Sequence, residues 1–577
     1  MQETVAGRRV FQPLHALSNL LLLAFTCLGA AQAQVVLAPS TPQTGSSNPV
    51  SAEPPVARPN VKPCIVPLLT NAAFDNFNAT TFNYAPPAAC PGPWAKVILT
   101  ADFTVSAGNQ FDRTGWFYLG DVNLFFGTTA EPRSNLSPSW HIERDVTDLT
   151  SVLKTAQPGS ASIGNIVNSE DTSTIFANAA LEFFPASPLG LAPATPDIVV
   201  GMSSGSNPAT LNTTASQLTQ TVNLPRNVEK VYLDVFAQNQ IDDEFFYLCV
   251  PNNETGPLES CGNTAFRETE ISIDGKPAGV APVFPFIFTG GIDPFLWEPL
   301  PGVQTLDFKP YRVDLTPFAG VLGDGSQHTV AISVFNANDF FNATANLLVF
   351  TDHGSGQVSG GLIRNSLSAA PTPVVNQNLA TSSAGVVTGT VSVGSNRNFS
   401  VSGFVNTSHG RVETTVEQTV NFLNTQTFNV NPTTGGDVQD VVQTSTVDSQ
   451  TTTQQGFLRE TVSRHVSYPL TVDFAFTPTP GGTATQATSV NQQNQQTETK
   501  ALNGFPLFES NTQEQVFSKD TLSINAADEI TAAAGNSSAS FQHKDSLGNC
   551  FSRSLTAENQ VLTSVKDGNG CQQQKRF

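Results

Sequence analysis

Two acidic residues, Asp112 and Glu143, lie in strand-like segments rich in aromatic residues, and no basic cluster surrounds them. If the first segment is extended, Asp112 shares a face with Trp116 and Tyr118, because successive side chains alternate between the faces of a strand. Two carboxylates on neighbouring strands among aromatic rings can differ in pKa, so that one stays protonated while the other is ionised. General acid–base catalysis requires this difference, so Asp112 and Glu143 are the first candidates for chemistry.

The alternative is that these carboxylates are ordinary surface charges, paired with Arg113, Arg133 or Arg144. Spacing alone favours this alternative, because most charged side chains are solvated at the surface. Trp297, in the segment TGGIDPFLWEPL, could stack on a sugar ring, but a core tryptophan is an equally good interpretation.

Other catalytic patterns are excluded by their context. The segment from Gly201 to Gly205 matches G-x-S-x-G, but a loop-like sequence follows it, whereas a nucleophile elbow must open into a helix. The 7 histidines form no H-E-x-x-H pattern, so no catalytic zinc is expected. No glycine-rich phosphate loop is present, and we expect neither a metal nor an organic cofactor.

The charge of the chain excludes one class of partner. The formal net charge is -20 and the pI is near 4.7. Nucleic acid phosphates need a basic surface, so nucleic acid binding is not expected. Only 13% of residues are charged, against about 25% in ordinary globular domains, and Asn, Gln, Ser and Thr supply the solvation instead.

The N-terminus predicts export. Residues 1–33 have the pattern of a secretory signal, with Arg8 and Arg9 before an apolar core and a small-residue cleavage site at Ala31 and Ala33. The apolar core is too short to anchor in a membrane, and prolines interrupt the later apolar stretches. We therefore expect a secreted protein, extracellular or in the cell wall, that has no membrane partner. Residues 34–62, rich in Pro and Ser, are expected to be a flexible leader.

Cysteines and glycosylation signals agree with export. Six cysteines remain after the signal, which leaves fifteen possible connectivities, and their clustering favours three local disulfides, Cys64–Cys90, Cys249–Cys261 and Cys550–Cys571. The N-x-Ser/Thr signals for N-glycosylation are at Asn78, Asn135, Asn212, Asn253, Asn342, Asn398, Asn406 and Asn536.

Alternation of apolar and polar residues predicts an all-β fold. Between residues 97 and 105 every second residue is apolar, and Gly, Pro and Asn turns separate similar segments further on. Two stretches, starting at Arg144 and Arg312, repeat the order of strand, Asp-then-Thr turn, short helical turn and closing strand, which indicates a duplication. We predict β-domains at 85–190 and 217–355, a linker at 364–385, and a third β-rich region at 386–577 that is either accessory or packed on the others.

The residues from about 97 to 350 resemble the peptide-N-glycosidase A family of amidases, which cleave the bond between asparagine and its N-glycan. The motifs that carry the resemblance are QFDR, TTAEPR, ERDVT, LEFFPA, DEFFY, FRE, IDGKPAG and TGGIDPFLWEPL. More distantly they are similar to peptide-N-glycosidase F, which is built of two eight-stranded jelly rolls with the active site between them. The resemblance therefore implies two jelly-roll-like antiparallel β-sandwich domains.

The resemblance also implies roles for individual residues. Asp112 would activate the attacking water or move its proton, and Glu143 would hold the first N-acetylglucosamine or stabilise the polarised carbonyl. The third family acid falls on Asn263 here, so either Glu244 or Glu268 would replace it, or this branch of the family dispenses with it. The alternative for both glutamates is an ordinary strand charge. The candidate substrate-binding residues are Arg113, Trp116, Glu131, Trp140 and Trp297.

The expected function is hydrolysis of the amide between asparagine and the first N-acetylglucosamine, with N-linked glycopeptides or glycoproteins as substrates. Two alternatives remain open. One is a non-catalytic carbohydrate-binding or cell-wall protein that keeps the fold. The other is an endo-N-acetylglucosaminidase, because a pair of carboxylates also suits glycoside hydrolysis.

Overall fold

The computed structural model describes residues 35–36, 42–187, 192–203, 205–568 and 571, and the predicted signal peptide, 1–33, lies outside them. The prediction of an all-β protein is confirmed, because antiparallel sheets form nearly all of the regular structure. Within the described residues, no helix is long and apolar enough to cross a membrane.

The first jelly roll is a sandwich of two four-stranded sheets, with orders β3-β10-β5-β8 and β4-β9-β6-β7. This interleaved order, with the first strand beside the last, is that of a jelly roll. The alternation predicted from residue 97 onward is confirmed in β5, where every second side chain is buried. The strands are β3 (Cys64–Phe74), β4 (Thr80–Tyr84), β5 (Trp94–Val105), β6 (Thr114–Leu119), β7 (Val122–Thr128), β8 (Ser139–Asp145), β9 (Gln157–Ile163) and β10 (Ile175–Pro185).

The second jelly roll repeats this plan with the sheet orders β11-β19-β14-β17 and β13-β18-β15-β16, while β12 also pairs with β19. The strands are β11 (Ile198–Met202), β12 (Ala209–Leu211), β13 (Leu218–Val222), β14 (Val228–Gln240), β15 (Glu268–Ile273), β16 (Lys276–Pro282), β17 (Tyr311–Asp314), β18 (His328–Phe335) and β19 (Phe340–Thr351). Both rolls begin before the predicted starts at 85 and 217. Their first strands were missed in the prediction because these strands are short or irregular in pattern.

The predicted duplication is visible in the turn that follows one strand of each roll. After β8 come η2 (Thr147–Leu149) and α2 (Thr150–Leu153), and after β17 come η5 (Thr316–Phe318) and α3 (Ala319–Leu322). In both turns an aspartate accepts the backbone N–H of the threonine two residues later, at 3.0 Å. The same side-chain bond therefore starts the same helical turn in each roll.

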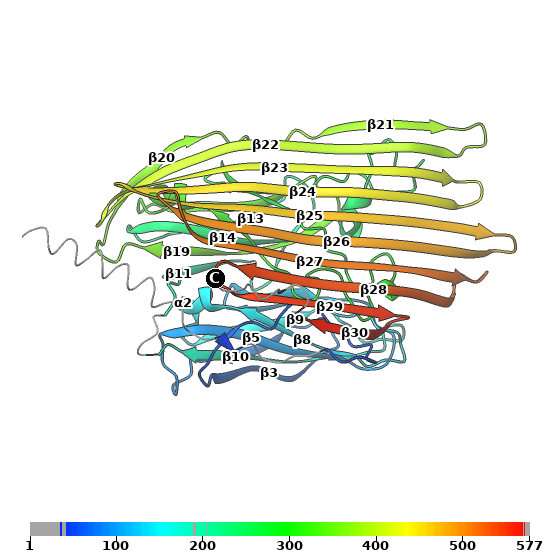
Figure 1. Ribbon diagram of the computed structural model, residues 1–577, viewed down its shortest axis with the longest axis horizontal. Coiled ribbons are helices and arrows are strands. Elements are labelled where there is room, and N and C mark those ends of the chain that lie inside the picture. The colour runs from blue at the N-terminus through cyan, green and yellow to red at the C-terminus, as the bar shows by residue number, and fades with distance from the viewer. Residues whose placement is uncertain (1–34, 37–41, 188–191, 204, 569–570, 572–577) are drawn as a thin grey trace, which may run out of the picture.

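The C-terminal sheet has eleven strands, and Figure 1 shows them running along the longest axis of the molecule. The strands are β20 (Ser359–Asn365), β21 (Val374–Thr381), β22 (Val387–Thr407), β23 (Gly410–Asn431), β24 (Gly436–Gln455), β25 (Leu458–Thr479), β26 (Thr483–Leu502), β27 (Phe505–Ile524), β28 (Ile530–Asp545), β29 (Cys550–Glu558) and β30 (Val561–Asp567). The predicted linker, 364–385, is instead partly a strand, because β21 pairs with β22 at the sheet edge.

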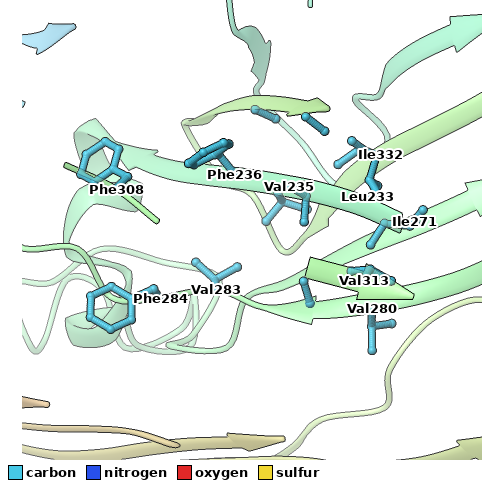
Figure 2. Close-up of a cluster of buried hydrophobic side chains, with 14 of the residues drawn as sticks. Leu233, Val235, Phe236, Ile271, Val280, Val283, Phe284, Phe308, Val313 and Ile332 are labelled. Atoms are coloured by element: carbon cyan, nitrogen blue, oxygen red, sulfur yellow. The ribbon is translucent and has the colours of Figure 1, made fainter. Parts of the chain in front are cut away.

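The C-terminal sheet packs on the second roll rather than standing apart. One hydrophobic cluster contains side chains of both, including Val447 and Leu470 from the sheet. Figure 2 shows the part of this cluster around β14, where Leu233, Val235 and Phe236 face apolar residues of neighbouring strands. Of the two arrangements that the sequence left open, the structure shows the packed one.

Residues 42–59, here called the N-terminal strap, are not the flexible leader that the composition suggested. The strap contacts all three sheet systems through backbone and charged groups. Its Gly45 and Ser46 pair with Leu562 of β30 at 2.7 and 2.9 Å, and Val50 donates to Pro299 at 2.9 Å. At its far end Arg58 forms ion pairs with the first roll. Long-range contacts of this kind leave no mark in local composition.

All three predicted disulfides are present, at Cys64–Cys90, Cys249–Cys261 and Cys550–Cys571. Seven of the eight asparagines in glycosylation signals are exposed. The exception is Asn342, which is half-buried and donates to Gln238 at 3.2 Å.

Candidate active site

Asp112 lies just before β6, and a partner segment that follows β7 holds it in place. The backbone N–H of Arg113 donates to the Thr129 hydroxyl at 2.8 Å, and the Thr129 N–H donates back to the Arg113 carbonyl at 2.9 Å. The β6–β7 pairing thus continues past the ends of both strands. It brings Glu131 beside Asp112, whose backbone N–H donates to Glu131 Oε2 at 3.2 Å.

The second roll supplies a backbone donor to the Asp112 carboxylate. Gly290, in the loop between β16 and β17, donates its N–H to Asp112 Oδ2 at 2.7 Å. The neighbouring Thr289 hydroxyl donates to the Thr129 carbonyl at 2.8 Å and so fixes this loop to the first roll. A Cβ at position 290 would lie 2.1 Å from Glu131 Oε2, so any other residue here would displace the Glu131 carboxylate from its place beside Asp112.

Glu244 comes from η3 (Ile241–Leu248), the helical segment that follows β14. Burial raises the pKa of Glu244 to about 8, and the charges of Asp112 and Glu131 contribute to this shift. Glu244 therefore lies within electrostatic range of the other two carboxylates. We call Asp112, Glu131 and Glu244 the acid cluster.

A buried ion pair beside Glu244 fixes η3. Asp243 and Arg267 are fully buried and lie 2.8 Å apart. The second oxygen of Asp243 accepts the backbone N–H groups of Asn338 and Asp339 at 2.8 and 3.0 Å. Breaking such a pair leaves an uncompensated buried charge, so η3 is held firmly where Glu244 enters the cluster.

The acid cluster has the electrostatics of a proton-transfer site. Burial raises the pKa of Asp112, although the Gly290 N–H and Arg113 oppose the shift. Burial and the nearby Asp112 charge raise the pKa of Glu131 to about 7. Since close carboxylates resist joint ionisation, the cluster holds protons at mildly acidic pH. The Gly290 N–H favours the ionised form of Asp112, so Asp112 is the member best suited to accept a proton.

Two isoleucines near the cluster adopt left-handed backbone conformations. Ile241, at the start of η3, has φ 53°, and Ile292, two residues after Gly290, has φ 69°. A β-branched residue at positive φ is an outlier, and such strain of about 1–3 kcal/mol concentrates at functional sites. Both segments that the second roll contributes to the cluster are therefore held in strained conformations.

Glu143 is placed differently from the prediction. It lies on the outer side of β8, where Arg58 of the strap forms two hydrogen bonds with it at 2.7 and 2.8 Å. Although desolvation alone would raise the pKa of Glu143, hydrogen bonds from His141 and Arg58 lower it to about 2. In the described part of the chain, no hydrogen bond or ion pair joins Glu143 to the acid cluster. Here Glu143 anchors the strap.

Glu268 also lies outside the acid cluster. It is buried in β15 and pairs with Arg397 of β22, and this contact ties the second roll to the C-terminal sheet. Burial raises the pKa of Glu268 to about 7, against the opposing effect of Arg397. Of the two candidates for the third acid, the structure therefore brings only Glu244 to Asp112.

The candidate substrate-binding residues divide into three groups. Glu131 belongs to the acid cluster itself. Trp140 and Trp297 are 5% and 2% exposed and are core residues, so neither has a free face for a sugar. Arg113 is turned towards Asp171 at 3.1 Å, while the half-buried Trp116 donates to Asn207 at 3.2 Å and remains partly accessible.

Gly290, Asp243 and Arg267 were not predicted as site residues. They lie in the segments TGGIDPFLWEPL, DEFFY and FRE, which carried the resemblance described above. A Gly-Gly pair directly after a buried apolar run was the available signal for close backbone approach, but nothing local showed which carboxylate it would meet.

Two jelly rolls that meet at a half-buried carboxylate cluster define an all-β protein with a candidate acid–base site. A family model, peptide N-acetyl-beta-D-glucosaminyl asparaginase amidase A, matches residues 54–365, which is more than half of the chain. The chain therefore belongs to this family, and the resemblance seen in its motifs is confirmed.

A curated relative supports the assignment. The chain is 30% identical over 383 residues to peptide-N4-(N-acetyl-beta-glucosaminyl)asparagine amidase A of Prunus dulcis. The match covers 62% of this chain and 66% of the relative, just under two thirds of the relative's length.

Solved structures give weaker similarities. PNGF-II matches with TM-score 0.36 and 13% identity over 51% of this chain and 66% of its own. PNGase F of Flavobacterium meningosepticum matches with TM-score 0.33 and 12% identity over 50% of this chain and 96% of its own. Scores this low add nothing to the strand order given above.

Proposed function

We propose that the protein is a peptide-N-glycosidase that hydrolyses the amide between asparagine and the first N-acetylglucosamine of an N-glycan. The observation that carries this proposal is the acid cluster, which lies where two jelly rolls of a chain in this family meet. The cluster supplies a proton acceptor and two proton donors at mildly acidic pH, as hydrolysis of an unactivated amide requires.

In the proposed reaction each carboxyl group has a separate task. Ionised Asp112 takes a proton from water as the water oxygen bonds to the amide carbon. Glu131, protonated at about pH 5 because of its pKa of about 7, donates a hydrogen bond to the carbonyl oxygen.

Glu244, with its pKa of about 8, gives its proton to the departing nitrogen as the C–N bond breaks. The products are aspartate in the peptide and a glycosylamine, and the site recovers when one proton passes from Asp112 to Glu244. No metal takes part in this proposal.

We further propose that the natural substrates are N-linked glycopeptides or glycoproteins met outside the cell. The three disulfides support this location, because disulfides persist in oxidising compartments. The exposed glycosylation signals fit the same route.

Mass spectrometry of a defined N-glycopeptide at about pH 5 tests the proposed activity. Loss of the whole glycan with conversion of asparagine to aspartate is expected. An N-acetylglucosamine left on asparagine would identify an endoglycosidase instead, and an unchanged glycopeptide would favour a binding protein.

The Asp112→Asn variant tests the site, and we expect its kcat to fall about 100-fold or more. Asp242→Asn is the matched control, because Asp242 is an exposed carboxylate in η3 outside the acid cluster. Near-normal activity in a folded Asp112→Asn protein would refute the assignment.

A further inference from the structure

The inner face of the C-terminal sheet carries buried amide side chains that form hydrogen bonds with groups outside the sheet. Asn424, Gln426 and Gln492 are 0% exposed, and Gln439 is 8% exposed. A buried amide costs free energy unless it is hydrogen-bonded, and an apolar residue would pack there without this cost. The partners of these amides therefore show what they do.

Three of these amides hold the end of η3. Asn424 Nδ2 donates to the Tyr247 carbonyl at 2.9 Å, and Gln426 Nε2 donates to the Cys249 carbonyl at 3.0 Å. Gln439 Nε2 donates to the Leu248 carbonyl at 3.1 Å.

The same three amides are bonded to one another. Gln426 donates to Asn424 at 3.0 Å, and Gln439 donates to Gln426 at 2.7 Å. The result is a continuous row of amides beneath the segment that delivers Glu244 to the acid cluster.

Gln492 closes the loop that carries Gly290. Its Nε2 donates to the Pro285 carbonyl at 2.7 Å, and its Oε1 accepts the Val303 N–H at 2.7 Å. One side chain of β26 thus joins the two ends of the loop. Further along, Gln486 donates to Asp293 at 3.0 Å and Ser518 donates to the Leu296 carbonyl.

The need for these contacts follows from the irregular backbone of both segments. Buried carbonyl and N–H groups outside regular structure must find partners elsewhere. The C-terminal sheet supplies them at the two places where the second roll enters the acid cluster.

We infer that the C-terminal sheet is a working part of the active site, with Gln426 and Gln492 as positioning residues for Glu244 and Gly290. This inference rests on the proposed function for its activity readout. The sheet is then not an independent glycan-binding module, because its amides set the geometry of the proton-transferring groups.

The variants Gln426→Met and Gln492→Met keep side-chain length but remove the hydrogen bonds. We expect kcat on the glycopeptide to fall about 10–100-fold in each, because a displacement of about 1 Å at a reacting group costs that much. The pH optimum should also move, since the spacing of the carboxylates sets their pKa values.

Gln418→Met is the control variant. Gln418 is a buried amide of β23 whose Nε2 has no hydrogen-bond partner among the described residues, and no bond joins its side chain to either segment. The kcat of this variant should stay within about twofold of wild type, because the substitution removes no hydrogen bond to η3 or to the loop that carries Gly290.

Gln492→Glu separates positioning from simple destabilisation. A buried glutamate has a raised pKa and is protonated at acidic pH, where its O–H can donate to Pro285 while the other oxygen accepts from Val303. Activity should therefore recover relative to Gln492→Met at about pH 5 and be lost again at about pH 8.

Hydrogen exchange makes the test independent of activity. Peptides covering residues 241–249 and 285–303 should exchange faster in the corresponding Met variant than in wild type. An inactive wild type would refute the proposed function alone, and the exchange result would still decide the inference. Folded Met variants with wild-type kcat, pH profile and exchange would overturn it.

Discussion

Replacing Glu244 with glutamine should make the protein more stable at neutral pH and inactive. Glu244 has an ordinary pKa of 4.5 when unfolded and about 8 in the folded protein, mainly because of burial. When folding raises the pKa of a carboxyl group, the group ionises more easily in the unfolded chain than in the folded protein. Ionisation above the unfolded pKa therefore stabilises the unfolded chain. Wild type therefore loses stability as pH rises from about 4.5 to 8, and the Gln variant avoids this loss.

The magnitude follows from the two pKa values. Linkage gives a penalty of about 4 kcal/mol at pH 8 and under about 1 kcal/mol at pH 5. Glu244 is partly accessible and shares protons with two other carboxyls, so we take about 2 kcal/mol as the value to expect at pH 8. An unfolding entropy of about 2.1 cal/mol/K per residue gives about 1.2 kcal/mol/K for the chain, so Tm should rise by about 2 °C at pH 8.

Thermal unfolding of wild type and Glu244→Gln at about pH 4 and about pH 8 measures this difference. The gap in Tm should be near zero at the lower pH and open as pH rises. Asp242→Asn serves as control, since this exposed neighbour should show no such trend. A pH-independent gap, or a variant less stable than wild type at pH 8, would show that Glu244 is not buried among other carboxylates.

Two further predictions concern Gly290 and Glu143. Gly290→Ala should lower kcat by about 100-fold or more in a folded protein, because its Cβ would lie 2.1 Å from Glu131 Oε2. The control variant Gly256→Ala, whose Cβ meets nothing within 4 Å, should keep the wild-type kcat. Equal kcat values in the two variants would contradict the geometry. Glu143→Gln should lower activity less than Asp112→Asn. It should also cost about 1–3 kcal/mol of stability at neutral pH, because Arg58 loses one of its two charged partners and keeps only Glu182. Since the pKa of Glu143 is lowered to about 2, its contribution to stability is present above about pH 4.5 and disappears towards pH 2. The Tm of wild type and Glu143→Gln measured over that range checks this, and a Tm difference that does not change with pH would refute it.

Local patterns predicted what depends on neighbours in sequence. The alternation in β5, the duplicated Asp-Thr turn and the three disulfides between cysteines close in the chain were all readable, because each rests on short-range geometry. Asp112 was singled out for the same reason, since it adjoins an aromatic strand with a clear pattern, and its catalytic role stays a prediction.

Contacts between distant segments could not be predicted in this way. The bond between Val56 and Glu143 joins residues 87 apart, and nothing near Glu143 distinguishes a strap anchor from a sugar ligand. For Trp297, at the end of η4 (Pro294–Trp297), the sequence left sugar stacking and a core position open, and the structure shows its indole donating to the Gly291 carbonyl inside the core. Glu131 and Glu244 join Asp112 only through tertiary pairing, so their partnership became visible only in the structure.

The pairing of the strap with β30 also sets an order for folding. Ser47 donates to the Gln560 carbonyl across 513 residues, so this contact closes nearly the whole chain into a loop. Residues 560–562 are synthesised more than 500 residues after the strap, so its segment from Gly45 to Ser47 stays without these partners until then. Both jelly rolls are complete in sequence by Thr351 and can form earlier, because domains fold as units during synthesis. The two ends of the strap can therefore dock at different times: the Arg58 end once the first roll has formed, and the Gly45–Ser47 end only after β30 has been made.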